Sequence, residues 1–341
     1  MFNKEFIAYV PINEVPNLYD RDIKMFTRIN LAFAKLKDNK AFIKDESFLQ
    51  NLHLLKEINP QLKILLSVGG AGAFGFSIMA NNEEYRKIFV DSLIDLIDKY
   101  NFDGIDLDWE FPTRDFGGDF AEYDRKNFTI LLKEIRERFD NHGEYLLTIA
   151  AGVGEWFVGS VELDKIPRYL DDILLMTYDL RGFGQEFTGL HTTLYTKKDD
   201  LIKMSASDGV ELLVKNGVPK EKIVIGFGQY SRFWEGVEPE NNGLLQKTAP
   251  NGGDHGPHYP LLQNEVIDNP LFDNYYDEEA QAPYSYSKKL KIFHSYDNAR
   301  SVRAKADFVM KENLKGLMFW RYVNWKENPL MLEMYKIIKE G

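Results

Sequence analysis

The sequence predicts an α/β fold, a (β/α)8 TIM barrel with a small α+β insertion between the seventh and eighth strands. Eight short apolar runs alternate with helical patterns, which is typical of right-handed βαβ units around a parallel sheet. A length of 341 residues with 44% hydrophobic side chains fits a barrel of this size as one packed unit. Carboxylates also gather near the end of the fourth run, where the active sites of such barrels lie.

The strands are predicted from apolar runs of six to nine residues, and the helices from apolar side chains at helical spacing. The predicted strands are Glu5–Val10, Thr27–Ala34, Leu62–Val68, Phe102–Glu110, Tyr145–Ala151, Asp172–Tyr178, Lys222–Phe227 and Lys315–Trp320. The predicted helices are Glu46–Ile58, Glu83–Tyr100, Glu122–His142, Leu201–Asn216, Ala299–Glu312 and Asn328–Lys339.

One interval, between Phe227 and Lys315, is too long for a connection without structure of its own. Its first part is rich in Gly, Pro, Asn and Tyr. We therefore predict a catalytic barrel formed by residues 1–230 and 290–341, and an α+β insertion subdomain over residues 231–289. Placed on the C-terminal rim of the barrel, this insertion would deepen a cleft.

Composition limits the classes of partner. A net charge of −11 disfavours nucleic acids and anionic membranes, and the absence of Cys excludes thiol chemistry and disulfides. The N-terminus lacks the pattern of a secretory signal, and no apolar run is long enough for a membrane span. We expect a monomer that is cytoplasmic, secreted by another route, or exported with its signal removed.

The segment from Asn101 to Phe111 places Asp106, Asp108 and Glu110 at alternate positions. Alternation along a strand puts the three carboxylates on one face, about 7 Å apart, and Trp109 on the other, packed face. Because this strand lies between two predicted helices, its acidic face points to an enclosed space. Repulsion and burial there raise pKa values, so Glu110 is predicted to be a general acid, and Asp106 and Asp108 to share a proton.

Two other interpretations of the acidic strand are open. One is that this strand forms the solvated face of an antiparallel sheet, and the other is that its carboxylates form a site for Mg²⁺ or Ca²⁺. The six histidines show no ligand spacing, and His255 and His258 are expected at the surface. We therefore expect no metal and no cofactor.

At this point the chain resembles glycoside hydrolase family 18, the chitinases and their relatives. The signature Asp103-Gly104-x-Asp106-x-Asp108-x-Glu110 is complete. Further matches in the expected order are Ser67-Val68-Gly69-Gly70, Met176-Thr177-Tyr178-Asp179, Tyr230-Ser231-Arg232, Ala282-Pro283-Tyr284 and Trp320. The segment Phe6–Pro11 is similar to bacterial exochitinases in particular.

The resemblance implies a retaining, substrate-assisted hydrolysis of β-1,4-linked N-acetylglucosamine in chitin or its oligosaccharides. Glu110 would protonate the leaving oxygen and later activate water, while the 2-acetamido group of the substrate attacks the anomeric carbon. Asp108 would hold the acetamido N–H, Asp106 would support Asp108, and Tyr178 would donate to the acetamido oxygen.

The resemblance also implies a set of substrate-binding residues, with Trp320 as the apolar floor beneath the sugar. These residues are Tyr9, Phe33, Met176, Asp179, Tyr230, Arg232 and Trp320. Gly69 and Gly70 are expected to have a structural role, because they allow close approach of neighbouring chain. Where many chitinases have a tryptophan beyond the MxYD motif, this chain has Phe183 and Gly184, which puts stacking on the product side in doubt.

Other functions stay open on the sequence. The same chemistry serves endo-β-N-acetylglucosaminidases and peptidoglycan-trimming hydrolases of the family. A non-catalytic chitin-binding lectin is the alternative from another class, and the presence of Glu110 counts against it.

Overall fold

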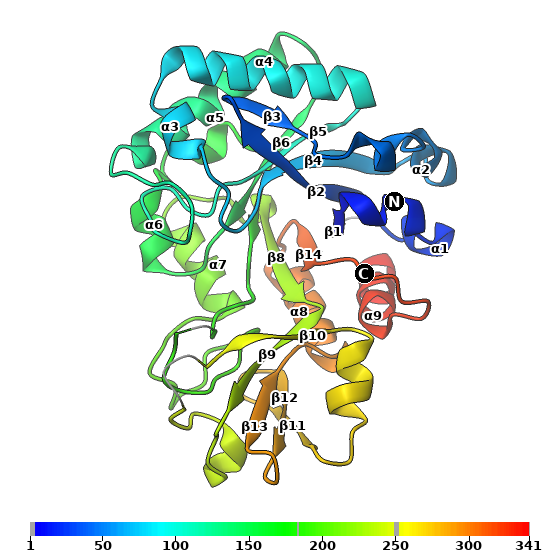
Figure 1. Cartoon of the computed structure of the whole chain (residues 1–341), viewed down its shortest axis with the longest axis vertical. Coiled ribbons are helices and arrows are strands. Elements are labelled where there is room, and N and C mark those ends of the chain that lie inside the picture. The colour runs from blue at the N-terminus through cyan, green and yellow to red at the C-terminus, as the bar shows by residue number, and fades with distance from the viewer. Residues whose placement is uncertain (1–3, 183, 249–251, 341) are drawn as a thin grey trace.

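The computed structural model describes residues 4–182, 184–248 and 252–340, and in this part of the chain eight parallel strands close into a barrel (Figure 1). The barrel strands are β1 (Glu5–Pro11), β2 (Arg28–Lys37), β4 (Lys63–Gly69), β5 (Gly104–Asp108), β6 (Leu146–Ala151), β7 (Asp172–Leu175), β8 (Ile223–Gly228) and β14 (Gly316–Trp320). Pairing of β1 with both β14 and β2 closes the barrel, which confirms the predicted TIM barrel and its eight strands.

Helices surround the barrel on the outside. They are α1 (Asp20–Ile23), α2 (His53–Ile58), α3 (Phe76–Ala80), α4 (Glu83–Tyr100), α5 (Asp124–Asp140), α6 (Glu155–Ser160), α7 (Ala206–Lys215), α8 (Ala299–Glu312) and α9 (Pro329–Glu340). Shorter 3-10 or π-helical turns lie at Ile12–Asn17, Glu46–Leu49, Ile166–Arg168, Lys220–Lys222, Glu240–Gly243 and Gln263–Ile267. None of the described helices is both long and apolar enough to cross a membrane.

The two helices whose bounds were predicted correctly have clear capping signals. The side chain of Asn82 accepts the backbone N–H of Tyr85 at the start of α4, and Asn101 ends this helix in the left-handed conformation, with φ 54°. At the start of α8, Asn298 and Ser301 form a reciprocal capping box.

Two predicted helices begin or continue differently in the structure. The prediction of one helix over Glu46–Ile58 is wrong, because i→i+3 hydrogen bonds from Gln50, Leu52 and Leu54 divide it into a 3-10 turn and α2. The helix predicted from Leu201 begins at Ala206 instead, because the Ser205 side chain caps it by accepting the N–H of Asp208.

A five-stranded antiparallel sheet leaves the barrel between β8 and β14 and lies below it in Figure 1. Its strands are β9 (Tyr230–Glu235), β10 (Asp254–His258), β11 (Asp273–Asp277), β12 (Ala282–Ser287) and β13 (Ile292–Ser295). Apart from this sheet, the short strand β3 (Lys40–Phe42) pairs with the barrel strand β2. The sheet has its own apolar core, which includes Trp234, Tyr284 and Phe293. The division of the chain at residues 231 and 289 stays a prediction.

The first acid of the signature motif has a structural position. Asp103 precedes β5, and its Oδ2 accepts the backbone N–H of Ile64 at 2.8 Å. Lys56 and Lys63 pair with the same carboxylate at 2.8 and 3.3 Å. Asp103 therefore fixes the start of β5 against β4, which sets the register that carries the other three acids to the opposite end of the barrel.

Candidate active site

Asp106 lies inside the barrel, where hydroxyl groups from three other strands donate to its carboxylate. Tyr9 and Ser67 donate to Oδ2 at 2.8 and 2.7 Å, and Thr148 donates to Oδ1 at 2.6 Å. Burial raises the pKa of Asp106, while these hydrogen bonds oppose the rise because they stabilise the ionised form. No hydrogen bond joins Asp106 to Asp108 among the described residues, so the proton shared between them stays a prediction.

Asp108 lies one step further along β5, and its side chain is buried. Burial raises the pKa of this carboxyl well above its usual range, and the charges of Glu110 and Asp106 raise it further. Its Oδ1 has no hydrogen-bond partner among the described residues. A buried oxygen of this kind is a ready acceptor for a donor on a ligand.

Glu110 lies just beyond β5, two residues after the end of the strand at Asp108. The predicted strand was therefore too long at this end, and Glu110 is partly exposed at the mouth of the barrel. Burial raises the pKa of Glu110 to about 7, and the nearby charge of Asp179 adds to this effect. A carboxyl group with this pKa holds a proton near neutral pH, as a general acid must.

Asp179 follows β7 and is held by a cation from the antiparallel sheet. Arg232 on β9 donates its Nε–H to Oδ1 of Asp179 at 2.7 Å. Burial acts to raise the pKa of Asp179, but hydrogen bonds from His191 and Arg232 outweigh burial and lower it below the usual range. Asp179 is thus an ionised carboxylate whose field acts on Glu110.

The predicted aromatic and apolar binding residues form one cluster at this end of the barrel. Its members include Tyr9, Phe33, Met176, Tyr178, Tyr230 and Trp320. The ring of Trp320 lies 5.4 Å from that of Phe33, nearly parallel to it, and 5.8 Å from that of Tyr9. Partial exposure of Phe33 and Trp320 leaves an apolar surface beside the acids.

Tyr178 lies in the same cluster with its hydroxyl group near the acids. Its described hydrogen bond is a weak one to Sδ of Met318, at 3.9 Å. Burial raises the pKa of Tyr178 well above its usual value, followed by the charges of Asp108 and Glu110. The phenol therefore keeps its proton and is able to donate it to a stronger acceptor.

The arrangement combines two neighbouring carboxyl groups with raised pKa values, one of which has a free oxygen, with a phenol donor and an aromatic surface. The family profile for glycosyl hydrolases family 18 matches residues 5–323. The chain belongs to glycosyl hydrolases family 18. The signature motif, SxGG, MxYD and the final tryptophan of this family thus meet at one end of its barrel.

Individual members of family 18 align over most of this chain. Chitinase A1 of Niallia circulans is 35% identical over 294 residues, which are 80% of this chain and 42% of that protein. A family 18 N-acetylglucosaminidase from Paenibacillus barengoltzii is 40% identical, with a TM-score of 0.95 over 98% of this chain and all of that one. A class V chitinase variant from Nicotiana tobaccum, solved in complex with NAG4, is 27% identical, with a TM-score of 0.86 over 98% and 99% of the two chains.

Two residues near the acids were not predicted from the sequence. Thr148 is a polar residue between Leu147 and Ile149 in β6, and this alternation was the signal that its side chain points into the barrel. Lys35 follows the apolar start of β2, and its charge opposes the rise in the pKa of both Asp108 and Glu110. The spacing of Lys35 in the sequence carried no sign of this proximity.

The predicted structural roles of Gly69, Gly70 and Trp109 are confirmed. A Cβ atom on Gly69 would lie 2.0 Å from the carbonyl oxygen of Asp108, and one on Gly70 would lie 2.6 Å from the ring of Phe33. Trp109 is 3% exposed, and its ring stacks on Phe76 at 5.2 Å. Phe183, the residue that raised doubt about stacking on the product side, lies outside the described residues.

His255 is exposed, as expected, and His258 is partly exposed. Their rings also lie 5.2 and 5.4 Å from that of Tyr230, so both contact the aromatic cluster. In the part of the chain that the structure describes, no group of three or more His, Asp or Glu residues is arranged to hold a metal ion.

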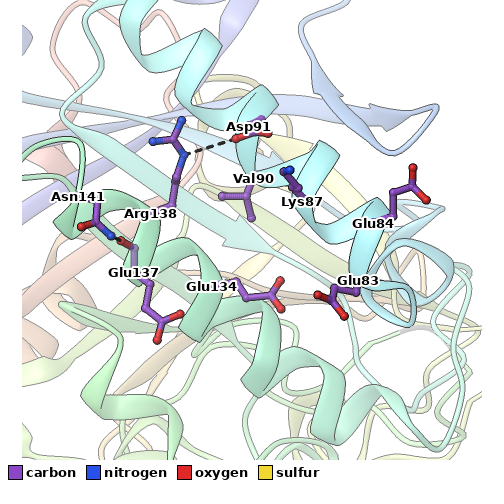
Figure 2. A pocket seen from close by; sticks show the side chains of 9 residues that line it. All are labelled: Glu83, Glu84, Lys87, Val90, Asp91, Glu134, Glu137, Arg138 and Asn141. Atoms are coloured by element: carbon purple, nitrogen blue, oxygen red, sulfur yellow. Dashed lines mark hydrogen bonds and ion pairs between the residues drawn. The ribbon is translucent and has the colours of Figure 1, made fainter.

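A separate cavity of about 710 Å³ lies outside the barrel between α4 and α5 (Figure 2). It is lined by Glu83, Glu84, Lys87, Val90, Asp91, Glu134, Glu137, Arg138 and Asn141. Arg138 already pairs with Asp91 across it, at 3.4 Å. The cavity shares no residue with the site at the barrel end.

Proposed function

We propose that the chain is a chitinase that hydrolyses β-1,4-linked N-acetylglucosamine polymers or oligomers with retention of configuration. The observation that carries the proposal is the placement of Glu110 two residues beyond the buried Asp108, whose Oδ1 has no hydrogen-bond partner among the described residues. Burial raises the pKa of Glu110 to about 7, so Glu110 serves as the proton donor and Asp108 as the acceptor that substrate-assisted hydrolysis requires. Membership of family 18 supports the same chemistry.

Each step has a residue in a suitable place. Glu110 protonates the glycosidic oxygen as the bond to the anomeric carbon breaks, and the 2-acetamido oxygen of the same sugar forms the new bond. The free Oδ1 of Asp108 accepts the acetamido N–H and stabilises the oxazolinium cation, while Asp106 anchors Asp108 from below. Glu110, now ionised, takes a proton from a water molecule. The oxygen of this water bonds to the anomeric carbon as the bond from that carbon to the acetamido oxygen breaks.

Contacts to the sugar follow from the same cluster. Tyr178 exchanges its weak bond to Met318 for the acetamido oxygen. Trp320 forms the apolar floor, since one face of a pyranose ring carries only C–H groups. Tyr9, Phe33, Met176, Tyr230 and the Asp179–Arg232 pair complete the wall around this sugar.

An N-acetylglucosaminidase is the second candidate. The match to the Paenibacillus barengoltzii enzyme of that description favours it, because the alignment covers 98% of this chain and all of that one. In contrast, this chain spans 42% of chitinase A1, so that protein's whole activity is a weaker guide. Endo-β-N-acetylglucosaminidase and peptidoglycan-trimming activities use the same acid and acetamido group, and a chitin-binding lectin would use the cluster alone.

Early product analysis distinguishes these functions. Purified protein is incubated with N-acetylglucosamine oligomers of two to six units, and products are separated by length and anomer. Smaller β-anomeric oligomers support a retaining chitinase, whereas release of the monomer alone supports the N-acetylglucosaminidase. α-Anomeric products exclude the assisted mechanism. Absence of cleavage rejects both candidates and leads first to N-glycan and peptidoglycan substrates, then to binding without hydrolysis.

A further inference from the structure

Lys35 lies on β2, two residues after Phe33 of the aromatic cluster, and its side chain is partly buried. Its Nζ donates to the carbonyl oxygen of Gly69 at 2.5 Å and lies 5.0 Å from the ring centre of Phe33. Both neighbours are uncharged. The ammonium is therefore held in a fixed place, and none of the described carboxylates is in direct contact with it, so its charge acts on the acids from a distance.

The carbonyl that holds Lys35 belongs to the residue beside Asp108. Gly69 on β4 is the register partner of Asp108 on β5, and the N–H of Gly70 donates to the Asp108 carbonyl at 2.9 Å. The anchor of the ammonium thus moves with the backbone that carries the acid. A lysine on a flexible loop would not have this fixed relation to the carboxylates.

The charged groups that face Asp108 and Glu110 come from several elements. Tyr9 on β1 and Tyr178 after β7 are buried phenols whose pKa values are raised well above their usual value, chiefly by burial, so they stay neutral. Asp106 lies below on β5, and Asp179 lies after β7. An arginine acts on each of these last two acids, Arg28 on Asp106 and Arg232 on Asp179, and each arginine is paired with a carboxylate.

Arg232 is bonded to Asp179, and Arg28 is bonded to Asp172 at 2.7 Å inside the barrel. The charge of Lys35 lowers the pKa of Asp108 and of Glu110, while these two acids oppose the effect of burial on Lys35 itself. Geometry and charge thus single out Lys35 as the cation that acts on the acid pair.

We propose that Lys35 is a positioning residue for the acid pair, whose ammonium, fixed on the Gly69 carbonyl, sets the pH range over which the pair carries one negative charge. This inference rests on the proposed hydrolysis, in which the singly protonated pair is the active form. Asp108 and Glu110 titrate as a pair. The loss of the first proton of the pair sets the acidic limb of the pH–rate profile, and the loss of the second sets the basic limb. Because a nearby cation favours both losses, removal of the charge moves both limbs to higher pH.

The test is the pH dependence of kcat/KM in three variants. K35M removes the charge and keeps most of the side-chain volume, and both limbs are expected to rise by roughly half to one pH unit. K35R keeps the charge and is expected to leave the limbs in place. K37M removes an exposed charge on the same strand and is the matched control, with an unchanged profile.

A lower rate in K35M with unmoved limbs would show that Lys35 has a structural role only, and would overturn the inference. A second measurement does not depend on turnover. The carboxyl carbon of Glu110, labelled with ¹³C and assigned by comparison with E110Q, is titrated by NMR in wild type, K35M and K35R. An unmoved Glu110 titration in folded K35M overturns the inference, whereas a moved titration in a protein without hydrolytic activity supports it and rejects the proposed function instead.

Discussion

Arg232 on the antiparallel sheet holds Asp179, at the end of β7, through a hydrogen bond of 2.7 Å. Asp179 in turn is the charge that, after burial, does most to raise the pKa of Glu110. The antiparallel sheet and the acid at the mouth of the barrel are therefore electrostatically linked. The protonation of Glu110 depends on a strand that the barrel itself does not contain.

The rate is expected to fall as pH rises through about 7, because Glu110 loses the proton that it must donate to the leaving group. On the acidic side, the rate is expected to fall as Asp108 gains a proton and can no longer accept the acetamido N–H. Initial rates on a soluble oligomer across pH 4 to 9 check both limbs. A rate that stays constant from pH 6 to 9 would contradict the role of Glu110 as general acid.

Glu110→Gln is expected to reduce kcat by a factor of roughly 10² to 10⁴, since general acid catalysis contributes that much. Affinity for an N-acetylglucosamine tetramer, measured by calorimetry, is expected to stay within a few-fold of wild type. The exposed Glu137, outside the barrel on α5, gives the control E137Q with unchanged kcat. Loss of binding together with turnover in E110Q would argue against a purely catalytic role.

The same substitution also has a stability consequence with a definite sign. The pKa of Glu110 is higher in the folded chain than its ordinary value, so the folded state binds the proton more tightly and loses stability as pH rises from about 4.5 to 7. Gln does not titrate. The melting temperature of E110Q minus that of wild type is therefore expected to increase from pH 5 to pH 8, as measured by differential scanning fluorimetry.

Asp108→Asn is expected to reduce kcat by roughly 10² to 10³, because an acceptor aimed at the developing cation is lost. A thiazoline that mimics the oxazolinium intermediate is expected to inhibit wild type competitively and to bind D108N more weakly. Inhibition constants for the two proteins check this directly. Equal inhibition of both, or an unaffected rate in D108N, would contradict the assisted mechanism.

Lys305 forms a buried ion pair that holds α8 to the chain after β13. Its Nζ lies 2.8 Å from both oxygens of Asp297 and also donates to Thr192. Lys305→Met leaves Asp297 buried without its cation, so the free energy of unfolding is expected to fall by about 3–5 kcal/mol in urea denaturation. The surface pair of Lys220 with Glu312 is the control, since K220M is expected to cost less than about 1 kcal/mol.

Much of the barrel could be predicted because most of its strands are apolar runs, β5 alternates apolar with acidic residues, and apolar residues recur every three to four positions in each long helix. The bounds of α4 and α8 were correct because capping residues end their patterns sharply. The order of the antiparallel sheet could not be predicted. Its strands β10 and β11, with the sequences DHGPH and DNYYD, are polar and partly exposed, so they carry little periodic signal.

In the site, too, features that depend on a single strand could be predicted, whereas contacts between residues far apart in the sequence could not. Alternation placed Asp106, Asp108 and Trp109 on the correct faces, because a side chain's face depends only on its own strand. The donors around Asp106 come from strands 39 to 97 residues away, so their contacts depend on barrel closure. The position of Lys35 likewise follows from the register of β2 with β4, which no local pattern records.

The sheet that carries Arg232 begins directly after β8 and ends before β14, two strands that are hydrogen-bonded neighbours in the barrel. Because β8 and β14 are parallel, the chain leaves the barrel at the C-terminal end of β8 and re-enters at the N-terminal end of β14 only after α8, so the insertion lies in this crossover connection and adds no strand to the barrel. The length of the insertion can therefore change without shifting the register of the barrel strands. A designed replacement for the insertion would have to keep one feature, a cation placed to bind Asp179.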